Sequence, residues 1–184
     1  MRDRDEHRTE DRALAWYETL RNRYRPAEIQ VLLVAESPPD PRAGERRFFY
    51  SPQLSYDNLY RGVATALYGT DLNFNLEDKP AVLERIKNDG IWLIDAVETP
   101  VNSLPKFKRQ AAIKARASEV IGICRDLNPK RGVIICHAGV YAVLAPSLRE
   151  AGVEVLHDAP LPFPRGNWRA DFVAGFRRAL GMTD

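Results

Sequence analysis

The sequence predicts an α/β protein, a three-layer α/β/α sandwich around a central, mainly parallel four-stranded sheet. Short apolar segments, most of them rich in β-branched residues, occur at 29–35, 91–95, 132–137 and 153–157. Segments with helical spacing separate them, and strands that alternate with helices form right-handed crossovers in a parallel sheet. The chain has 184 residues, of which 45% are hydrophobic and 28% charged, and this suffices for one core.

The first predicted element is an amphipathic helix over residues 7–24. Apolar side chains recur there near helical spacing, at Leu14, Trp16, Tyr17, Leu20 and Tyr24. We expect a single domain over 1–184, with 1–26 as a peripheral helical segment and 29–180 as the core. The sequence contains no internal repeat and no long low-complexity linker that would separate a second domain.

Capping signals divide the remainder of the core into further helices. Ser51 and Pro52 are typical of an N-cap followed by the first helical position, and this helix would run towards Gly69. The other predicted helices span about 79–88, 109–127, 138–152 and 167–180.

Every predicted strand ends on an ionisable side chain. Glu36 directly follows the first strand, and Asp95 ends the second. His137 ends the third and His157 the fourth. Any one of these residues could simply mark a strand's exit into water, but in an open parallel sheet ligands bind beyond the carboxyl ends of the strands. The four together therefore predict a polar cleft with several titratable groups.

Three of the strands lead into long, proline-rich loops that mix basic and aromatic residues. The loop sequences are SPPDPRAGERRFFYSP, AVETPVNSLPKFKR and DAPLPFPRGNWR. The aromatic residues could merely anchor these loops, but basic and aromatic side chains together suit the phosphates and bases of a nucleic acid. The net charge of +2 would then conceal a basic face. The predicted nucleic-acid contacts are Arg46, Arg47, Lys106, Lys108, Arg165, Gly166, Asn167 and Arg169.

The order of these motifs resembles that of the uracil-DNA glycosylase superfamily over roughly residues 29–180. AESPP is similar to the family's motif after the first strand, commonly G-E-A-P-G. GERRFFYSPQL resembles the segment with a base-stacking phenylalanine, and IWLIDAVETP the strand with a base-reading asparagine. HDAPLPFPRGNW takes the place of the family's H-P-S-P-type loop. The sequence departs from the family at Ala35 and Pro39 in place of glycines, Asp95 in place of asparagine, and Leu161 in place of histidine.

The resemblance implies a DNA glycosylase-like protein that hydrolyses the N-glycosidic bond of a damaged or deaminated base. Glu36, held by the stiff turn after it, would stabilise the oxocarbenium-like sugar and orient the attacking water. His137 and His157 are candidates to donate a hydrogen bond to the departing base.

The resemblance also implies which residues would hold the flipped base. Phe49, or else Phe48, would stack on it, and Ser37 and Asp95 would contact its edge. An ionised aspartate only accepts hydrogen bonds, whereas an asparagine also donates them. We therefore expect either that the ligand is not plain uracil or that Asp95 is protonated.

Other interpretations stay open. A catalytically inactive protein of this fold would bind nucleic acid or a nucleotide without chemistry, which the substituted motifs favour. A metal-dependent hydrolase could use Glu36, Asp95, His137 and His157, although their spacing gives it little support. A Cys136–His137 nucleophile pair is disfavoured, because neighbouring strand residues point to opposite faces.

Composition limits the cofactors and the environment. With 2 cysteines the chain cannot form a four-cysteine metal or iron–sulfur site, and we predict no cofactor and no metal. No apolar run approaches the roughly 20 residues that span a bilayer, and the start MRDRDEHRTEDR lacks a signal's apolar region. We expect a cytoplasmic monomer without membrane contact, whose partner is DNA, single-stranded DNA included, or a nucleotide.

Overall fold

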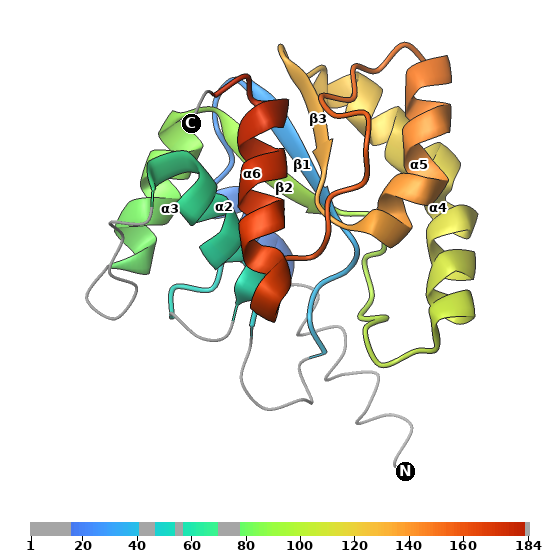
Figure 1. Ribbon diagram of the computed structural model, residues 1–184, viewed down its shortest axis with the longest axis horizontal. Coiled ribbons are helices and arrows are strands. Elements are labelled where there is room, and N and C mark those ends of the chain that lie inside the picture. Colours follow the sequence, from blue (N-terminus) through green and yellow to red (C-terminus); the bar gives the residue numbers. More distant parts are fainter. Residues whose placement is uncertain (1–15, 41–46, 54–56, 70–77, 183–184) are drawn as a thin grey trace.

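The centre of the protein is a parallel sheet of three strands in the order β2-β1-β3. The strands are β1 (Val31–Ala35), β2 (Ile91–Asp95) and β3 (Gly132–Ile135). The computed structural model describes residues 16–40, 47–53, 57–69 and 78–182 (Figure 1). Val31 lies opposite both Ile91 and Gly132, so β1 is paired on both sides, and all of its residues are buried. The predicted α/β class and the parallel sheet are confirmed.

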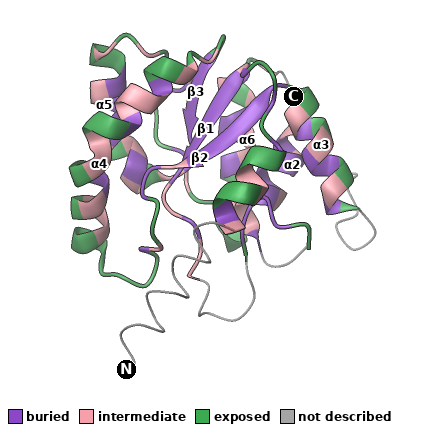
Figure 2. Ribbon diagram, turned by 180° about the vertical axis from the view of Figure 1, so that it is seen from behind, coloured by how far each residue is buried: buried purple, intermediate pink, exposed green. Residues whose placement is uncertain are grey.

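Helices cover both faces of this sheet. They are α2 (Asn58–Tyr68), α3 (Lys79–Asn88), α4 (Lys106–Leu127), α5 (Ala138–Glu150) and α6 (Arg169–Ala179). The chain moves from β1 to β2 in one direction along the sheet and from β2 to β3 in the other, so right-handed crossovers place their helices on opposite faces. Helices α2, α3 and α6 accordingly lie on one side, and α4 and α5 on the other (Figures 1 and 2).

The predicted fourth strand is wrong, because 153–157 pairs with β3 only through the isolated bridge between Val133 and Val155. The backbone N–H of Val133 donates to Glu154, and that of Leu156 donates to Val133. The next rung of the ladder would use the N–H of Ile135. The His157 side chain takes that donor instead, with Nε2 accepting at 3.0 Å. A side chain thus ends the pairing, and within the described residues the sheet keeps three strands.

The helix predicted to open at Ser51 begins later. Residues 51–53 are not helical, and α2 starts at Asn58. Burial of Phe48, Phe49 and Tyr50 draws this segment into the core, and the Ser51 N–H closes a turn on the Phe48 carbonyl at 3.0 Å. The Ser-Pro pair therefore serves a turn rather than a helix start.

The described part of the predicted first helix, residues 16–23, packs firmly on the core, while residues 7–15 lie outside the described residues. Tyr17 is 2% exposed, and its hydroxyl donates to the Pro39 carbonyl at 2.5 Å. The Trp92 indole donates to the Arg21 carbonyl at 3.1 Å. These contacts join the helix to the loop after β1 and to β2.

Helix α4 is the longest helix in the described chain, with 22 residues, and it begins at Lys106, slightly before the predicted start. Only Ile113, Val120 and Cys124 of this helix are buried, so one narrow stripe faces the core. None of the described helices combines the length and the apolar character needed to cross a lipid bilayer.

Candidate functional site

A cleft of about 430 Å³ lies at the carboxyl ends of the strands, the edge at which a parallel sheet is expected to bind ligands. Its wall combines residues that follow all three strands with residues from the flanking loops. The polar and aromatic lining residues are Glu36, Ser37, Arg47, Phe48, Phe49, Asp57, Asn58, Asp95, Asn102, Arg109, His137, Phe163 and Arg165.

Glu36 stands directly after β1 and is held by Arg109 from the first turn of α4. The Arg109 Nε donates to Glu36 Oε1 at 3.0 Å, and Nη2 lies 2.8 Å from Oε1 and 2.7 Å from Oε2. The Glu36 side chain is 12% exposed and that of Arg109 27% exposed. A forked guanidinium fixes both the position and the plane of a carboxylate. Arg109 was absent from the predicted site, although the basic loop KFKR contains it.

His137 joins this pair from the N-cap of α5, two residues after the end of β3 and not within the strand as predicted. Its Nδ1 accepts the Gly139 N–H at 3.1 Å and thereby caps α5, and it lies 3.9 Å from Glu36 Oε1. Burial lowers the pKa of His137, with Glu36 opposing that shift and Arg109 adding to it. While Nδ1 accepts, the proton of the neutral ring is on Nε2. Nε2 lies 3.3 Å from the Arg109 Nη2 at the cleft, and because both nitrogens then carry hydrogen this contact is not a hydrogen bond.

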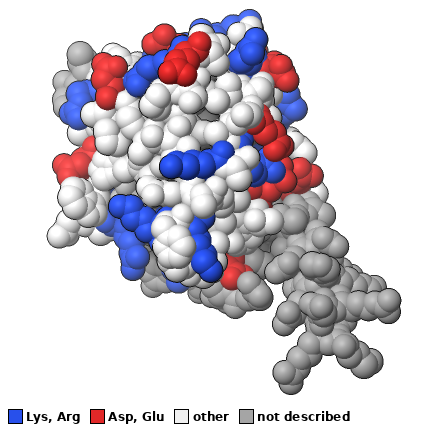
Figure 3. All heavy atoms as spheres, turned by 90° about the vertical axis from the view of Figure 1, so that its right-hand side faces the viewer, with Lys and Arg blue, Asp and Glu red and all other residues white. Residues whose placement is uncertain are grey.

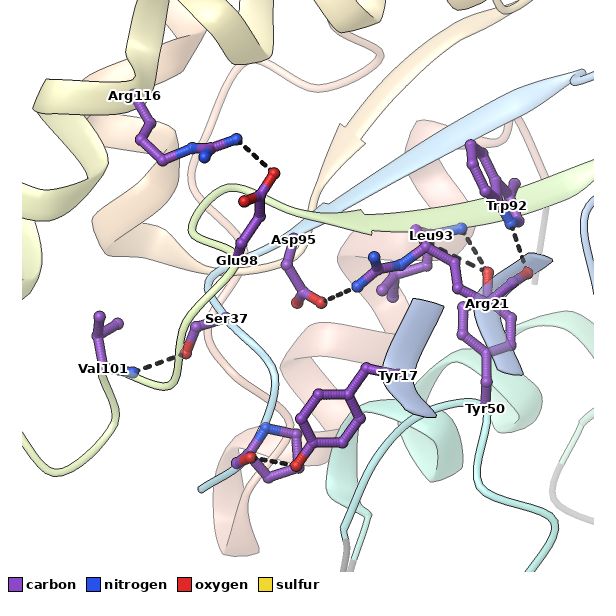
Figure 4. Close-up of polar contacts among 11 residues, drawn as sticks. Tyr17, Arg21, Ser37, Tyr50, Trp92, Leu93, Asp95, Glu98, Val101 and Arg116 are labelled. Carbon is purple, nitrogen blue, oxygen red and sulfur yellow. Dashed lines mark hydrogen bonds and ion pairs between the residues drawn. The ribbon is translucent and has the colours of Figure 1, made fainter. Parts of the chain in front are cut away.

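Asp95 ends β2 and forms an ion pair with Arg21 of the N-terminal helix. The Arg21 Nη2 lies 2.5 Å from Asp95 Oδ2, and the aspartate side chain is 4% exposed (Figure 4). Burial raises the pKa of Asp95 to about 6, although Arg21 opposes the shift. Asp95 thus lines the cleft as a buried, positioned group, and its partner comes from a helix that the sequence placed at the periphery.

The two phenylalanines predicted to stack on a base lie deep in the wall. Phe48 is 2% exposed and Phe49 is 5% exposed. Phe163, from the loop before α6, is 37% exposed, and its ring centre lies 6.0 Å from that of His137. This loop can approach α2 because a Cβ on Gly62 would lie 2.8 Å from the Pro164 side chain. Phe163 belongs to the aromatic and basic loop pattern but was not selected from sequence.

Asp57 of the cleft wall forms a buried ion pair with Lys79 that sequence reasoning missed. The Lys79 ammonium bonds Asp57 Oδ2 and the Phe48 carbonyl, and it lies 4.5 Å from the centre of the Tyr60 ring. Their side chains are 1% and 2% exposed. Burial lowers the pKa of Lys79, and Asp57 opposes that shift. No spacing rule links residues 57 and 79, so only the fold brings them together.

His157 does not line this cleft. Its Nε2 accepts a hydrogen bond from the Ile135 N–H, and its Nδ1–H donates one to the Ala159 carbonyl at 2.8 Å. Both ring nitrogens are thus bound to backbone. Ser37 lies in the cleft wall, and its hydroxyl accepts the Val101 N–H at 3.3 Å, which ties two of the loops together (Figure 4).

The predicted nucleic-acid contacts lie in different parts of the structure. Arg47 and Arg165 line the cleft. Lys106 and Lys108 are exposed at the start of α4, while Gly166 and Asn167 form a short 3₁₀ turn before α6. Arg169 donates to Asn58 at 3.2 Å. Arg46 lies outside the described residues.

The side of the molecule that carries α4 and α5 is not uniformly charged. In Figure 3 the upper half mixes acidic and basic side chains, whereas basic side chains predominate in the lower part. That lower part is the edge at which α4 begins (Figure 1). The near-neutral chain thus has a locally basic edge.

Two further observations concern metal ligands and thiols among the described residues. No group of three or more His, Cys, Asp or Glu residues in the described ranges could hold a metal ion. Cys124 and Cys136 are buried free thiols, and burial raises the pKa of both.

The fold and the cleft define an α/β protein with a candidate active site at the carboxyl edge of a parallel sheet. No known protein-family model matches the sequence, and no curated protein matches it.

Proposed function

We propose that the protein is a DNA glycosylase-like hydrolase that cleaves the N-glycosidic bond of a damaged or deaminated base. One observation carries the proposal. Glu36 is fixed at the cleft by Arg109 with His137 beside it, in a chain whose motifs resemble the uracil-DNA glycosylase superfamily. A carboxylate at that position suits a reaction in which positive charge develops on a sugar.

Glu36 would act on the sugar and the water. As the bond from C1′ to the base breaks, its electron pair leaves with the base and the sugar becomes oxocarbenium-like. The Glu36 carboxylate stabilises that charge and accepts a proton from the water that attacks C1′. Arg109 holds the carboxylate in place, so little reorganisation is needed during the reaction.

His137 and Phe163 would act on the base. With Nδ1 engaged by Gly139, the His137 Nε2–H donates to the departing base and stabilises its negative charge. Phe163 offers an exposed ring on which the flipped base stacks and offsets part of the cost of flipping, a few kcal/mol. Arg47 and Arg165 at the cleft, and the basic start of α4, contact the backbone phosphates.

Base release from labelled oligonucleotides tests this proposal. The substrates contain uracil, hypoxanthine, xanthine or mismatched thymine, each in single- and double-stranded DNA. We expect release by the native protein and a loss of at least about 100-fold in Glu36→Gln, since removing one charge-stabilising group costs roughly that much. The matched control is Glu98→Gln, because Glu98 is an exposed glutamate bonded to Arg116 at 3.0 Å.

Two outcomes would contradict the proposal. One is no release from any substrate by folded native protein, and the other is equal loss in the Glu36 and Glu98 variants. Circular dichroism and the melting temperature establish that each protein is folded.

A second candidate is a binding module without chemistry. Arg109 contacts both oxygens of Glu36, and a neutralised carboxylate is a poorer group for stabilising a cation. Fluorescence anisotropy with single-stranded DNA or a nucleotide would then report binding that Glu36→Gln retains, in a protein that releases no base.

A further inference from the structure

Asn58 lines the cleft with a side-chain amide whose orientation is fixed by its partner. It is the first residue of α2 and is half-buried. The Arg169 Nη2, from the start of α6, donates to Asn58 Oδ1 at 3.2 Å. Because a guanidinium donates hydrogen bonds and accepts none, the oxygen and not the nitrogen of the amide must face Arg169. The Asn58 Nδ2 is therefore turned away from Arg169.

This amide nitrogen is available to a ligand. No described residue accepts a hydrogen bond from Asn58 Nδ2. The nitrogen carries two N–H donors and accepts no hydrogen bond. An asparagine can ordinarily present either its oxygen or its nitrogen, and the contact with Arg169 makes this one a donor at the cleft.

The cleft has Glu36, Arg109 and His137 on one side and Asn58 on the other. Arg109 and His137 come from the starts of α4 and α5, and both helices cover one face of the sheet. Asn58 comes from the start of α2, which covers the other face (Figures 1 and 2). A ligand that occupies the cleft therefore meets the Glu36 carboxylate at one end and the Asn58 amide at the other.

Phe163 connects these two sides. Its ring centre lies 6.0 Å from that of His137. The next residue, Pro164, lies against α2, because a Cβ on Gly62 would be 2.8 Å from the Pro164 side chain. Gly62 follows Asn58 by four positions and so lies on the same face of that helix. A base that stacks on Phe163 with its glycosidic bond towards His137 thus turns its other edge towards Asn58.

We propose that Asn58 is the specificity-determining residue of the cleft, and that its Nδ2 donates to a carbonyl oxygen on the edge of the base. An amino group at the same position of the base would set a donor against a donor. Deamination replaces such an amino group by a carbonyl, so this one contact distinguishes a deaminated base from its parent. The inference rests on the proposed function, in that the ligand is taken to be a base on Phe163, and it names the residue that selects that base.

The test compares bases that differ only by an oxo or an amino group. The ligands are single-stranded oligonucleotides with one 2′-fluoro nucleoside, whose glycosidic bond resists cleavage. The pairs are uracil with cytosine and hypoxanthine with adenine, and fluorescence anisotropy on the full chain at pH 7.5 measures their affinities. We expect the oxo member of each pair to bind at least about fivefold more tightly, because the amino member leaves the Asn58 donor without a partner. Equal or tighter binding of the amino members overturns the inference, as does no binding of any oligonucleotide at millimolar concentration.

Asn58→Asp removes the donor and keeps the shape of the side chain. Its carboxylate still accepts from Arg169, and an acidic residue in the first turn of a helix is favourable. We expect the oxo-to-amino affinity ratio to fall at least about fivefold. Asn22→Asp is the matched control, because Asn22 is an exposed asparagine outside the cleft, and its ratio should equal that of the native protein. An unchanged ratio in folded Asn58→Asp overturns the inference.

Arg169 is a positioning residue, and its variant tests whether the orientation of the amide matters. Arg169→Met frees the Asn58 amide to turn, so that either its oxygen or its nitrogen can face the base. We expect the oxo-to-amino ratio to fall about threefold, whereas the loss of a phosphate contact alone would weaken all the oligonucleotides equally. An equal loss of affinity with an unchanged ratio would overturn the fixed orientation on which the inference depends.

The release assay separates this inference from the proposed function. An oxo preference that Asn58→Asp abolishes, in a protein that releases no base, would overturn the glycosylase and leave the role of Asn58 standing. Base release that depends on Glu36, with the same oxo-to-amino ratio in Asn58→Asp as in the native protein, would overturn the role of Asn58 and leave the glycosylase standing.

Discussion

Two histidines follow buried segments at the same side of the sheet, yet their surroundings differ in kind. His157 gives both ring nitrogens to backbone groups, of Ile135 and Ala159. His137 gives one nitrogen to a helix cap and keeps the other beside Arg109 at the cleft. A titratable side chain at a strand end is therefore a candidate for chemistry only when the backbone leaves part of it free.

The largest effect we expect in this comparison is the effect of a His157 substitution on stability. His157→Ala leaves the buried Ile135 N–H without its partner, removes the bond to the exposed Ala159 carbonyl, and opens a cavity. We expect the free energy of unfolding to fall by about 3 kcal/mol, measured by chemical denaturation. Base release per folded molecule should not change. A fall below about 0.5 kcal/mol would mean that the His157 imidazole does not stabilise the fold in place of a hydrogen bond between strands.

The next largest effect is that of a His137 substitution on activity. His137→Asn keeps a good N-cap for α5, so the unfolding free energy should change little, while the donor at Nε2 is lost. We expect base release to fall by about 10- to 100-fold. Single-turnover kinetics beside denaturation curves measure both quantities. Loss of stability with unchanged release would reverse the roles given to the two histidines.

A pH comparison gives a smaller effect with a definite sign. Burial lowers the pKa of His157 below the ordinary 6.5, so below that pH the unfolded chain binds more protons than the folded protein. The stability that neutral His157 contributes is therefore present above pH 6.5 and is lost as the pH falls. His157→Gln can still accept the Ile135 N–H but does not titrate, so it should lose less stability between pH 7.5 and 5.5 than the native protein. Identical losses would exclude this linkage.

The smallest effect concerns the arginine beside each histidine, Arg149 beside His157 and Arg109 beside His137. Arg149 donates to the His157 carbonyl at 2.7 Å, but its side chain is 40% exposed. Arg149→Gln should change the unfolding free energy by no more than about 0.5 kcal/mol and leave base release unchanged. Arg109→Gln should instead reduce base release, because Glu36 loses its clamp. If Arg149→Gln and Arg109→Gln changed base release equally, the surroundings of His157 and His137 would no longer differ in function.

The α/β class, the parallel sheet and most positions of the helices and strands could be predicted from the sequence. Buried strands and helices are recognisable because their apolar residues follow local patterns. The sequence did not reveal that residues 153–157 form no fourth strand. The His157 imidazole ends their pairing with β3, and in the sequence it looks like any polar residue after a strand. The position of Glu36 followed from the end of β1, whereas Arg109 reaches it over 73 positions of sequence. The Asp57–Lys79 and Asp95–Arg21 pairs are likewise products of the fold, and no local pattern connects their members.

The Arg21–Asp95 ion pair also limits how the chain can be shortened. A polypeptide beginning at residue 29 would retain all three strands, and it would leave the buried Asp95 carboxylate without its cation. Removing one member of a buried pair typically costs about 3–5 kcal/mol, a large part of the roughly 5–15 kcal/mol by which whole domains are stable. The smallest fragment that folds by itself must therefore include Arg21, which lies 74 positions before Asp95. It is longer than a fragment that contains only the three strands and the helices that follow them.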